Sequence, residues 1–535
     1  MMATPMYDVA IAGFGPTGAV AAALLGRRGI STFVCDRLRD VYDKPRAIAL
    51  DHEIMRVFQE LGIEGEVAQF TEPFTDSHFY GVDGELIKCM STVEPPYPLG
   101  YSPSLVFTQP PVERALRRHV ASLPTVTVSL GQTVTELAQA ECSATLMLRA
   151  EDGAVSEVRA RYLLACDGAS STVRGLAGLE LQDLGFDEPW LVVDVLVNER
   201  GLAKLSRVSA QYCEPARPCS YIIGPGNHRR WEISINHGED PRHLATPEGT
   251  WPLLARWITP EDASLWRQAS YRFHALVASE WRAKQVFLAG DAAHQQPPFL
   301  GQGMCQGVRD VANLCWKLDA VLTDQAPDSL LDTYTAERKA HVTELTSRIK
   351  HIGQLIGERD VDAARARDQQ LLAQAGGEVK PTPRQDLQPP IVSGEVSQTC
   401  LARQTHAARG TLFPQPWIAR PEGRMRLDHL TGANWRLVLA GGPAAPLRAA
   451  ALQARLDNGL VLVDLADPAW AEDEGVLAAW MQRHQTQAAL VRPDHYVFGV
   501  SSSADELSDQ LAQMHAFTNG RQMESAHGGR EPAGR

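Results

Sequence analysis

A glycine-rich turn near the start of the chain limits its fold more than any other feature. Gly13, Gly15 and Gly18 form the pattern GxGxxG. The apolar run DVAIAGFG, which enters this turn, is typical of a buried strand. Residues 18–28 are typical of a helix, and STFVCDR is typical of a second strand. This order predicts a βαβ unit that binds a dinucleotide, rather than an ordinary glycine-rich turn.

Each glycine of the turn has a separate physical reason. Gly13 permits the tight turn, Gly15 lets the backbone approach a pyrophosphate, and Gly18 allows close helix packing. The helix N-terminus adds positive potential for the phosphates. Asp36 ends the next strand and would accept hydrogen bonds from ribose hydroxyls, and the adjacent Arg37 is a further candidate contact. The motif alone does not distinguish FAD from NAD.

Length, charge and cysteine spacing exclude several classes of protein. A chain of 535 residues predicts roughly two to four domains. A net charge of -13 disfavours nucleic acid and anionic lipid as partners, because both require clustered Lys and Arg. No apolar run approaches the ~18 residues of a membrane span, and no signal-like segment is evident, so we expect a cytoplasmic protein. The nine cysteines never form CxxC, which indicates reduced thiols and no metal site.

The strand and helix pattern predicts an α/β protein with a discontinuous first domain. Strands that end in glycine turns recur near 162–168 and 286–291. We therefore assign 1–181 and 276–372 to one dinucleotide-binding domain. Residues 182–275 alternate short apolar runs with Gly and Pro turns, which predicts an inserted antiparallel sheet for substrate binding.

The rest of the chain predicts a third unit. Residues 373–395 are rich in Pro, Gly and charge and form a linker or an extended arm across another domain. Strand-like and helix-like runs then alternate over 396–518, which indicates a small α/β domain. Residues 519–535 are polar and Gly-rich and are predicted to be disordered.

Two longer motifs point to the cofactor and to a family. Residues 166–174 read CDGASSTVR, and GDAAH at 290–294 is followed by PPFLGQGM at 297–304. Both resemble the DG and GD motifs of the class A flavoprotein aromatic hydroxylases, the family of para-hydroxybenzoate and phenol hydroxylases. Over about residues 5–360 the chain looks most like the 3-(3-hydroxyphenyl)propionate hydroxylases, on the strings YDKPRAIALDHEIMRVFQELGI, QYCEPARP and GPGNHRRWE.

The resemblance implies a fold. It consists of a Rossmann-like FAD-binding domain with an inserted para-hydroxybenzoate hydroxylase-like sheet domain. The C-terminal piece, with VRPDHYVFGV, resembles the thioredoxin-like domain of phenol and polyketide hydroxylases. Since it lacks CxxC, we expect it to serve packing or dimerisation, with a homodimer as one outcome.

The resemblance also assigns FAD contacts. In the GD segment these are Gly290, Asp291, Pro298, Gly301, Gly303 and Met304. Asp291 would bind the ribityl chain, Pro298 would pack near the flavin ring, and the glycines would set a helix N-terminus against the pyrimidine end. The physics agrees, because reduced flavin is negative there and a helix N-terminus stabilises negative charge.

Three further contacts follow from the same resemblance. Arg46 would lie beside the pyrophosphate, unless it is a solvated loop charge, and Gln109 would lie along the ribityl chain. Asp167 would contact FAD or NAD(P)H, or would instead hold two loops together. Cys305 departs from the family, which often has Asn at this position.

The implied activity is that of an FAD-dependent monooxygenase. NADH or NADPH would reduce non-covalent FAD, dioxygen would add at C4a, and the hydroperoxide would hydroxylate a phenol ortho to its hydroxyl. The implied substrate is 3-(3-hydroxyphenyl)propionate or a related phenolic acid of aromatic catabolism. Because the chain has only one GxGxxG, the nicotinamide must bind transiently.

A base that removes the phenolic proton would help this reaction. Phenol hydroxylase relatives carry Asp or His where this chain has Ile48. Asp51 and His52 are the nearest titratable alternatives, and the competing interpretation places both on a helix surface.

A carboxylate on the substrate needs a cationic partner when it leaves water. Candidate substrate contacts in the inserted sheet are Arg217 and Arg230, with Tyr212 and Tyr221. Strand alternation points Arg229 and Arg230 to opposite faces. The alternative for each arginine is a surface position paired with a carboxylate such as Glu232.

Other functions remain open at this stage. A tailoring hydroxylase of polyketides or other large aromatics shares every FAD motif and differs in pocket size. A flavin-dependent halogenase would need a WxWxIP run, which the chain lacks. A non-enzymatic FAD-binding scaffold would show no substrate-stimulated NADH oxidation.

Overall fold

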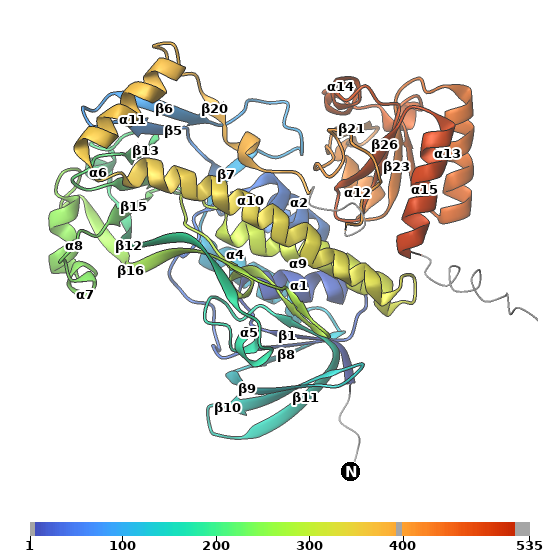
Figure 1. Cartoon of the computed structure of the whole chain (residues 1–535), viewed down its shortest axis with the longest axis horizontal. Coiled ribbons are helices and arrows are strands. Elements are labelled where there is room, and N and C mark those ends of the chain that lie inside the picture. Colours follow the sequence, from blue (N-terminus) through green and yellow to red (C-terminus); the bar gives the residue numbers. More distant parts are fainter. Residues whose placement is uncertain (1–5, 392–398, 519–535) are drawn as a thin grey trace, which may run out of the picture. The chain divides into compact units, whose positions relative to one another are not determined.

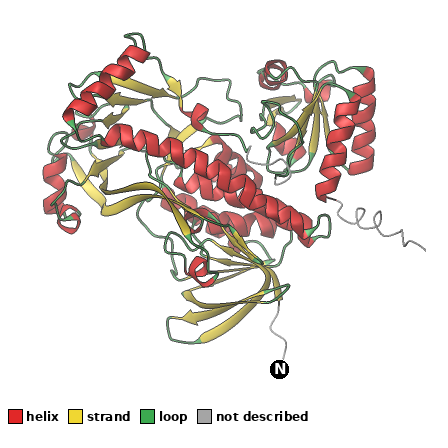
Figure 2. Ribbon diagram, viewed as in Figure 1, coloured by secondary structure: helices red, strands yellow, loops and turns green. Residues whose placement is uncertain are grey.

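The computed structural model describes residues 6–391 and 399–518. They fall into two compact units, Met1–Val311 with Val342–Gln388, and Ala312–His341 with Pro389–Arg535. Figures 1 and 2 show their helices and strands. The predicted disordered tail, 519–535, and the predicted boundary at 395/396 lie outside the described residues.

The first unit contains a mostly parallel sheet in the order β17-β18-β11-β1-β2-β8, with β9 and β10 beside β11. Its strands are β1 (Met6–Ala12), β2 (Thr32–Asp36), β8 (Val126–Leu130), β9 (Gln132–Gln139), β10 (Ala144–Ala150), β11 (Val155–Ala165), β17 (Arg282–Ala283) and β18 (Val286–Leu288). β1 pairs in parallel with both β2 and β11. The predicted Rossmann-like βαβ unit is therefore confirmed.

The helices of this part of the chain are α1 (Pro16–Arg27), α2 (His52–Leu61), α3 (Glu64–Ala68), α4 (Gln109–Ala121) and α5 (Thr172–Leu176). Of these, α1, α4 and α5 contact strands of the sheet. All nine residues from Gly18 to Gly26 of α1 are buried, which explains its run of alanines and leucines. Gly26 is required at a close contact, because a Cβ there would lie 2.5 Å from the Val126 side chain. α1 and α4 pack side by side (Figure 1).

A nine-stranded sheet forms the second layer of this unit, in the order β19-β16-β12-β15-β14-β13-β5-β6-β20. Its strands are β5 (Ser77–Tyr80), β6 (Leu86–Ser91), β12 (Leu181–Val197), β13 (Ser209–Tyr212), β14 (Cys219–Ile223), β15 (His228–Ser234), β16 (Ala263–Ala278), β19 (His294–Gln295) and β20 (Thr382–Pro383). The sheet thus reaches beyond the predicted span of 182–275, because β5, β6, β19 and β20 come from flanking segments.

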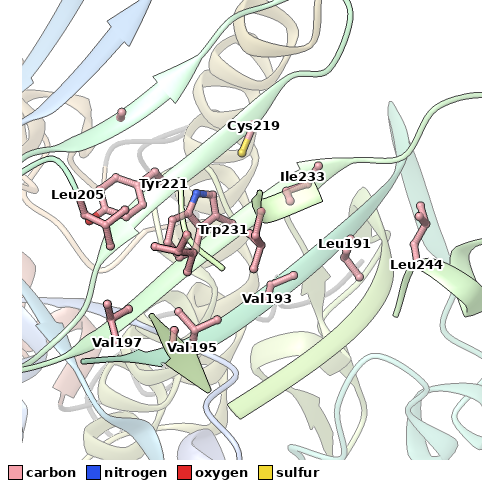
Figure 3. Close-up of a cluster of buried hydrophobic side chains, with 14 of the residues drawn as sticks. Leu191, Val193, Val195, Val197, Leu205, Cys219, Tyr221, Trp231, Ile233 and Leu244 are labelled. Carbon is pink, nitrogen blue, oxygen red and sulfur yellow. The ribbon is translucent and has the colours of Figure 1, made fainter. Parts of the chain in front are cut away.

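The two faces of the nine-stranded sheet differ in chemistry. One face packs a hydrophobic cluster that includes Leu191, Val193, Val195, Tyr221 and Trp231 (Figure 3). Ser220, Asp194, Arg230 and Glu232 alternate with these residues along the same strands, so they point to the other face, where they are buried although polar or charged. One face is therefore core, and the other is available to build a site.

Further elements complete the first unit and join it to the second. A small sheet contains β3 (Ala49–Asp51), β7 (Ser104–Phe107) and β4 (Thr71–Pro73). The helical elements are α6 (Glu199–Leu202), α7 (Pro241–Leu244), α8 (Pro247–Leu254), η1 (Gly290–Ala292), α9 (Gly303–Leu322), η2 (Asp328–Leu331), α10 (Asp332–Gly357), α11 (Val361–Gln374) and η3 (Arg384–Leu387). β20 pairs with β6, so the predicted linker contributes an edge strand and a helical turn to the first unit.

The second unit contains a four-stranded sheet in the order β24-β23-β25-β26. Its main elements are β23 (Arg436–Leu439), α13 (Ala445–Asn458), β24 (Val461–Asp464), α14 (Val476–Arg483), β25 (Ala488–Val491), β26 (Val497–Ser501) and α15 (Ala504–Thr518). The smaller elements are β21 (Trp417–Arg420), β22 (Gly423–Arg426), α12 (Leu427–Thr431) and η5 (Pro468–Trp470). A parallel βαβ unit followed by an antiparallel pair and a helix is the predicted thioredoxin-like order, which is confirmed. No helix within the described ranges is long and apolar enough to cross a membrane.

Candidate active site

A cavity of about 390 Å³ opens within the first unit. The glycine turn, the loop around residue 46, the DG and GD segments, the nine-stranded sheet and η3 all contribute to its wall. Eight of the predicted FAD contacts line it: Gly15, Arg46, Gln109, Asp291, Pro298, Gly301, Gly303 and Met304. The predicted cofactor residues and the polar face of the sheet therefore meet at one cavity.

The three glycines of the turn divide into two kinds. Gly13 has φ +99°, and a Cβ there would lie 2.3 Å from the Cys166 carbonyl oxygen. A Cβ at Gly18 would lie 2.0 Å from the carbonyl oxygen of Gly13. A Cβ at Gly15 would meet nothing within 4 Å, and Gly15 lines the cavity. Two glycines are thus needed for backbone packing, and the third leaves room for a ligand to approach the backbone.

Two helix N-termini point their positive ends at the cavity. α1 begins after Gly15 without a side-chain cap, and Pro16 and Thr17 line the cavity. α9 begins at Gly303, which lines the cavity together with Met304. Uncapped backbone N–H groups and the helix dipole favour negatively charged ligand groups at such positions.

Several predicted contacts hold the backbone around this cavity. The Asp36 carboxylate accepts hydrogen bonds from the backbone N–H of Phe14 at 2.6 Å and of Leu38 at 2.7 Å. Gln109 Oε1 accepts from the N–H of Arg46 at 3.0 Å and of its neighbour at 2.7 Å. Gln109 therefore fixes the loop that carries Arg46. Arg37 is exposed and does not line the cavity.

The GD and DG segments have different roles. Asp291 faces the cavity with an exposed side chain, and desolvation by the protein around it raises the pKa of its carboxyl group. Gly290 has φ +61° and donates its N–H to Asp310 at 2.9 Å. Asp167 does not line the cavity, and it accepts from Ser171 Oγ at 2.5 Å and from the Val173 N–H at 3.1 Å. These bonds match the structural alternative for Asp167.

The polar face of the sheet supplies the opposite wall. Gln211, Ser220 and Glu232 lie in one cross-strand row of β13, β14 and β15, and all three line the cavity. Ser220 Oγ donates to Gln211 Oε1 at 2.5 Å. Each of the three is at most 4% exposed. The wall therefore presents buried polar groups to anything held in the cavity.

Arg230 also lines the cavity, but its guanidinium is already used. Its Nε donates to Asp194 Oδ1 at 2.7 Å and its Nη2 to Asp194 Oδ2 at 3.1 Å. The same side chain donates to the carbonyl oxygens of Arg46, at 2.9 Å, and of Pro45. Arg230 thus ties the loop of Arg46 to the sheet, and its planar fork has no free edge for a substrate carboxylate.

The other predicted substrate residues point elsewhere. Tyr221 lies in the hydrophobic cluster on the core face and donates its hydroxyl to the Ser206 carbonyl oxygen at 3.2 Å (Figure 3). Tyr212 packs on the same face against Trp257. Arg217 forms a two-bond pair with Glu239 at 2.9 and 2.6 Å. None of the three lines the cavity, because strand register and a local carboxylate direct them away from it.

Asp51 and His52 do not line the cavity either. Asp51 caps α2 by accepting from the N–H of Glu53 at 3.1 Å, and its second oxygen pairs with Arg309. Burial alone would raise the pKa of Asp51, but the Arg309 charge and these hydrogen bonds outweigh burial and lower it. Burial lowers the pKa of His52 to about 4. The geometry thus gives Asp51 a structural role and does not support either residue as the phenol-activating base.

Glu232 and Arg384 are two of the charged cavity residues that the sequence reasoning did not place there. In the strand HRRWEIS, Glu232 lies two residues from Arg230, so both side chains point to the same face of the sheet. Strand alternation would have predicted this face for Glu232 if Trp231 had been assigned to the core. Arg384 projects from η3, in the segment predicted as a linker or arm, and no periodic pattern marks it.

Arg384 is a cation that no carboxylate of the described chain pairs with. Its guanidinium donates to Ser77 Oγ at 3.0 Å and stacks 4.1 Å from the centre of the Phe74 ring. Burial lowers its pKa to about 10, which keeps it protonated at neutral pH. Among the residues that the structure describes, no carboxylate forms an ion pair with it. A desolvated cation in this state favours an anionic ligand.

Comparison with known proteins identifies the family. A family model described as an FAD binding domain matches residues 6–349, and one described as an HcaD C-terminal domain matches residues 410–516. The chain is 38% identical over 520 residues to a "Probable NADH-specific resorcinol 4-hydroxylase" of Rhodococcus jostii (strain RHA1), covering 95% of this chain and 94% of the relative. It belongs to the class A flavoprotein aromatic hydroxylases. The predicted family and its FAD cofactor are confirmed.

This hydroxylase has other relatives along its whole length. It is 32% identical over 542 residues to a "3-(3-hydroxy-phenyl)propionate/3-hydroxycinnamic acid hydroxylase" of Burkholderia cenocepacia (strain HI2424), covering 97% of this chain and 98% of the relative. Its fold matches the flavin-dependent monooxygenase PieE with a TM-score of 0.79 at 20% identity, covering 96% and 99% of the two chains. Aklavinone-11 hydroxylase matches with a TM-score of 0.76 at 22% identity, covering 96% and 99%.

Proposed function

We propose that this hydroxylase uses NADH or NADPH and dioxygen to hydroxylate a phenolic acid ortho to its hydroxyl group, with 3-(3-hydroxyphenyl)propionate as the model substrate. The relatives of known name support the substrate class, because one is named for that phenylpropionate. Position 4 of resorcinol, in the name of the other, is also ortho to a hydroxyl. Both compounds are phenols with a substituent in the meta position.

The residues around the cavity fit FAD. The open space at Gly15, the N-termini of α1 and α9 at the cavity wall, and Asp291 supply the groups that a pyrophosphate, a flavin ring and a ribityl chain require. Bound FAD supplies the redox chemistry, accepting hydride from the nicotinamide and passing electrons to dioxygen, one atom of which enters the ring. The protein must hold the phenol at the cavity wall and exclude water from it.

The position of Arg384 is the single observation that supports an acidic substrate. Its guanidinium lines the same cavity as Glu232 and the GD segment, and it has no acidic protein partner within the described chain. A substrate carboxylate would pair with this cation and compensate its desolvation. The aromatic ring would then lie between Arg384 and the cofactor residues.

The test compares 3-(3-hydroxyphenyl)propionate with 3-propylphenol, which has a similar shape and no charge. We expect wild type to prefer the acid, and Arg384→Met to lose about 30-fold or more in kcat/KM for the acid while keeping its activity on the neutral phenol. Arg217→Met is the matched control, because Arg217 is paired with Glu239 outside the cavity. Equal kcat/KM for both compounds in wild type would contradict an acid substrate.

Resorcinol is the second candidate, because the relative named for it is 38% identical over 95% of the chain. Resorcinol has no carboxylate, so Arg384→Met should leave its turnover nearly unchanged. A wild-type preference for resorcinol over both phenols above would establish this second function in place of the first.

Asp291 tests the cofactor assignment. We expect purified protein to carry FAD that is released on denaturation, and Asp291→Ala to weaken FAD binding about ten- to a hundredfold, as for loss of a charged hydrogen bond. The ratio of flavin to protein after gel filtration measures this. Asp83→Ala, at an exposed position away from the cavity, is the control. Equal flavin retention by both variants would remove Asp291 from the FAD site.

A further inference from the structure

Glu232 is a buried carboxylate that faces the cavity. It is 2% exposed, and its Oε2 has no hydrogen-bond partner. An unsatisfied carboxylate oxygen is costly in a protein interior and is retained where a ligand completes its hydrogen bonding. The neutral side chains nearest to it along the cross-strand row, Ser220 and Gln211, are already bonded to each other.

Charge balance does not explain Glu232. The adjacent Arg230 is paired through both Nε and Nη2 with Asp194, and the distance from Arg230 Nη1 to Glu232 Oε1 is 4.0 Å. Asp194 also accepts from His228 at 2.8 Å and lies 3.6 Å from Arg267. The buried cations of this face therefore have a closer carboxylate than Glu232.

We propose that Glu232 accepts the phenolic proton of the bound substrate. The inference deepens the proposed function and rests on it. The O–H bond of the phenol breaks, the proton moves to the carboxylate of Glu232, and the electron pair stays on the phenol oxygen. Delocalisation of that pair raises the electron density at the ortho carbon, which is the carbon that receives oxygen. The proton passes to solvent before the next turnover.

The surroundings of Glu232 suit this task. Burial raises the pKa of Glu232 to about 7, with Arg230 and Arg267 lowering it and Asp194 raising it further. These are the charged groups that face it from β15, β16 and β12. A carboxylate with this pKa is a stronger base than an ordinary glutamate by roughly two to three orders of magnitude, which brings it closer to a phenol with a pKa of about 10.

The pH dependence of turnover is the first test. We expect kcat/KM of wild type to rise with pH up to about 7 and then to level, because Glu232 must lose its proton before it can accept one. Glu232→Gln should lose about a hundred- to a thousandfold at neutral pH and should continue to recover as the phenol itself ionises near pH 10. Glu239→Gln, outside the cavity, is the matched control and should keep the wild-type profile.

Ligand binding gives a second test that needs no turnover. The probe is 4-nitrophenol, an acidic phenol, bound to the oxidised FAD enzyme. If the bound 4-nitrophenol shares one proton with Glu232, binding takes up a proton at pH values above the pKa of both groups. The Kd for wild type should then rise about tenfold per pH unit in that range. For Glu232→Gln the Kd should stay constant over this range. Identical pH dependence in wild type and variant would overturn the proposal.

These tests separate the proton acceptor from the choice of substrate. If wild type turns over resorcinol or 3-propylphenol rather than the phenylpropionate, the acid-substrate proposal fails, and the same pH profiles are measured with the preferred phenol. If the variant retains FAD, stability and the wild-type pH profile on that phenol, Glu232 is only a structural charge. A loss of FAD or stability is detected by the flavin ratio and thermal unfolding, and the less perturbing Glu232→Asp should then restore part of the pH-dependent activity.

Discussion

Gly13→Ala is expected to lose nearly all FAD and to unfold at a markedly lower temperature. The backbone at Gly13 has φ +99°, and the new Cβ would lie 2.3 Å from the Cys166 carbonyl oxygen and 2.8 Å from the Asp167 nitrogen. Both are backbone atoms of the neighbouring strand end, which cannot move aside as a flexible side chain would. Strain and overpacking together should cost about 2–5 kcal/mol.

Two further alanine variants make this result specific. Gly175→Ala has room for its Cβ and does not line the cavity, so it should keep wild-type stability and flavin content. Gly15→Ala also has room for its Cβ but lines the cavity, so it should fold normally and bind FAD more weakly. Thermal unfolding and the flavin ratio of the three proteins are the measurements. A Gly13→Ala protein with full flavin content would refute the assigned role of the turn.

Asp194→Asn is expected to destabilise the first unit by about 3–5 kcal/mol, because it leaves Arg230 and Arg267 buried without a full negative charge. Burial alone would raise the pKa of Asp194, but Arg230 and His228 outweigh it and lower that pKa. Because the pKa of Asp194 is lower in the folded state, the carboxylate stabilises the protein at pH values above its unfolded-state pKa of about 3.9. This stabilisation is lost as the pH falls through the folded-state pKa. The difference between variant and wild type should therefore shrink as the pH falls below about 4.

The control for Asp194 is an exposed ion pair. Glu151 and Arg39 are both more than half exposed and lie 2.9 Å apart, so Glu151→Gln should cost at most about 1 kcal/mol. Urea unfolding, monitored through the release of flavin, gives the loss in free energy of unfolding for both variants. A loss below 1 kcal/mol in Asp194→Asn would mean that the buried pairs do not hold this sheet together.

The parts of the site that the sequence predicted are those where backbone geometry restricts residue type. The turn of Gly13 and Gly18 admits no Cβ, and the GD segment must place a helix start beside Asp291. Such constraints fix both the residue and its spacing, so the motif predicts its structure. The βαβ unit follows from a similarly local pattern, whereas the thioredoxin-like order was implied by the resemblance of the C-terminal segment to other hydroxylases.

Side-chain direction on the inserted sheet was harder to predict. Tyr212 and Tyr221 are amphipathic, and only the strand register shows that they face the core. Arg230 does face the cavity, but a carboxylate far away in sequence, Asp194, occupies its guanidinium. Arg384 lies in a Pro-rich segment without periodicity, so only the three-dimensional structure shows that it reaches the cavity. Long-range partners decide each of these roles.

The pairing of β20 with β6 has a consequence for how such enzymes diversify. It anchors the segment that carries Arg384 to the sheet edge through backbone hydrogen bonds, which do not depend on the side chains that follow in η3. Glu232 belongs to an interior strand whose alternate residues form the core, so its neighbourhood tolerates little change. If Arg384 and Glu232 have the roles proposed above, changes within 384–387 would alter which aromatic compounds are accepted while the chemistry at the sheet stays intact, so this short stretch is the natural target for libraries that seek new substrates.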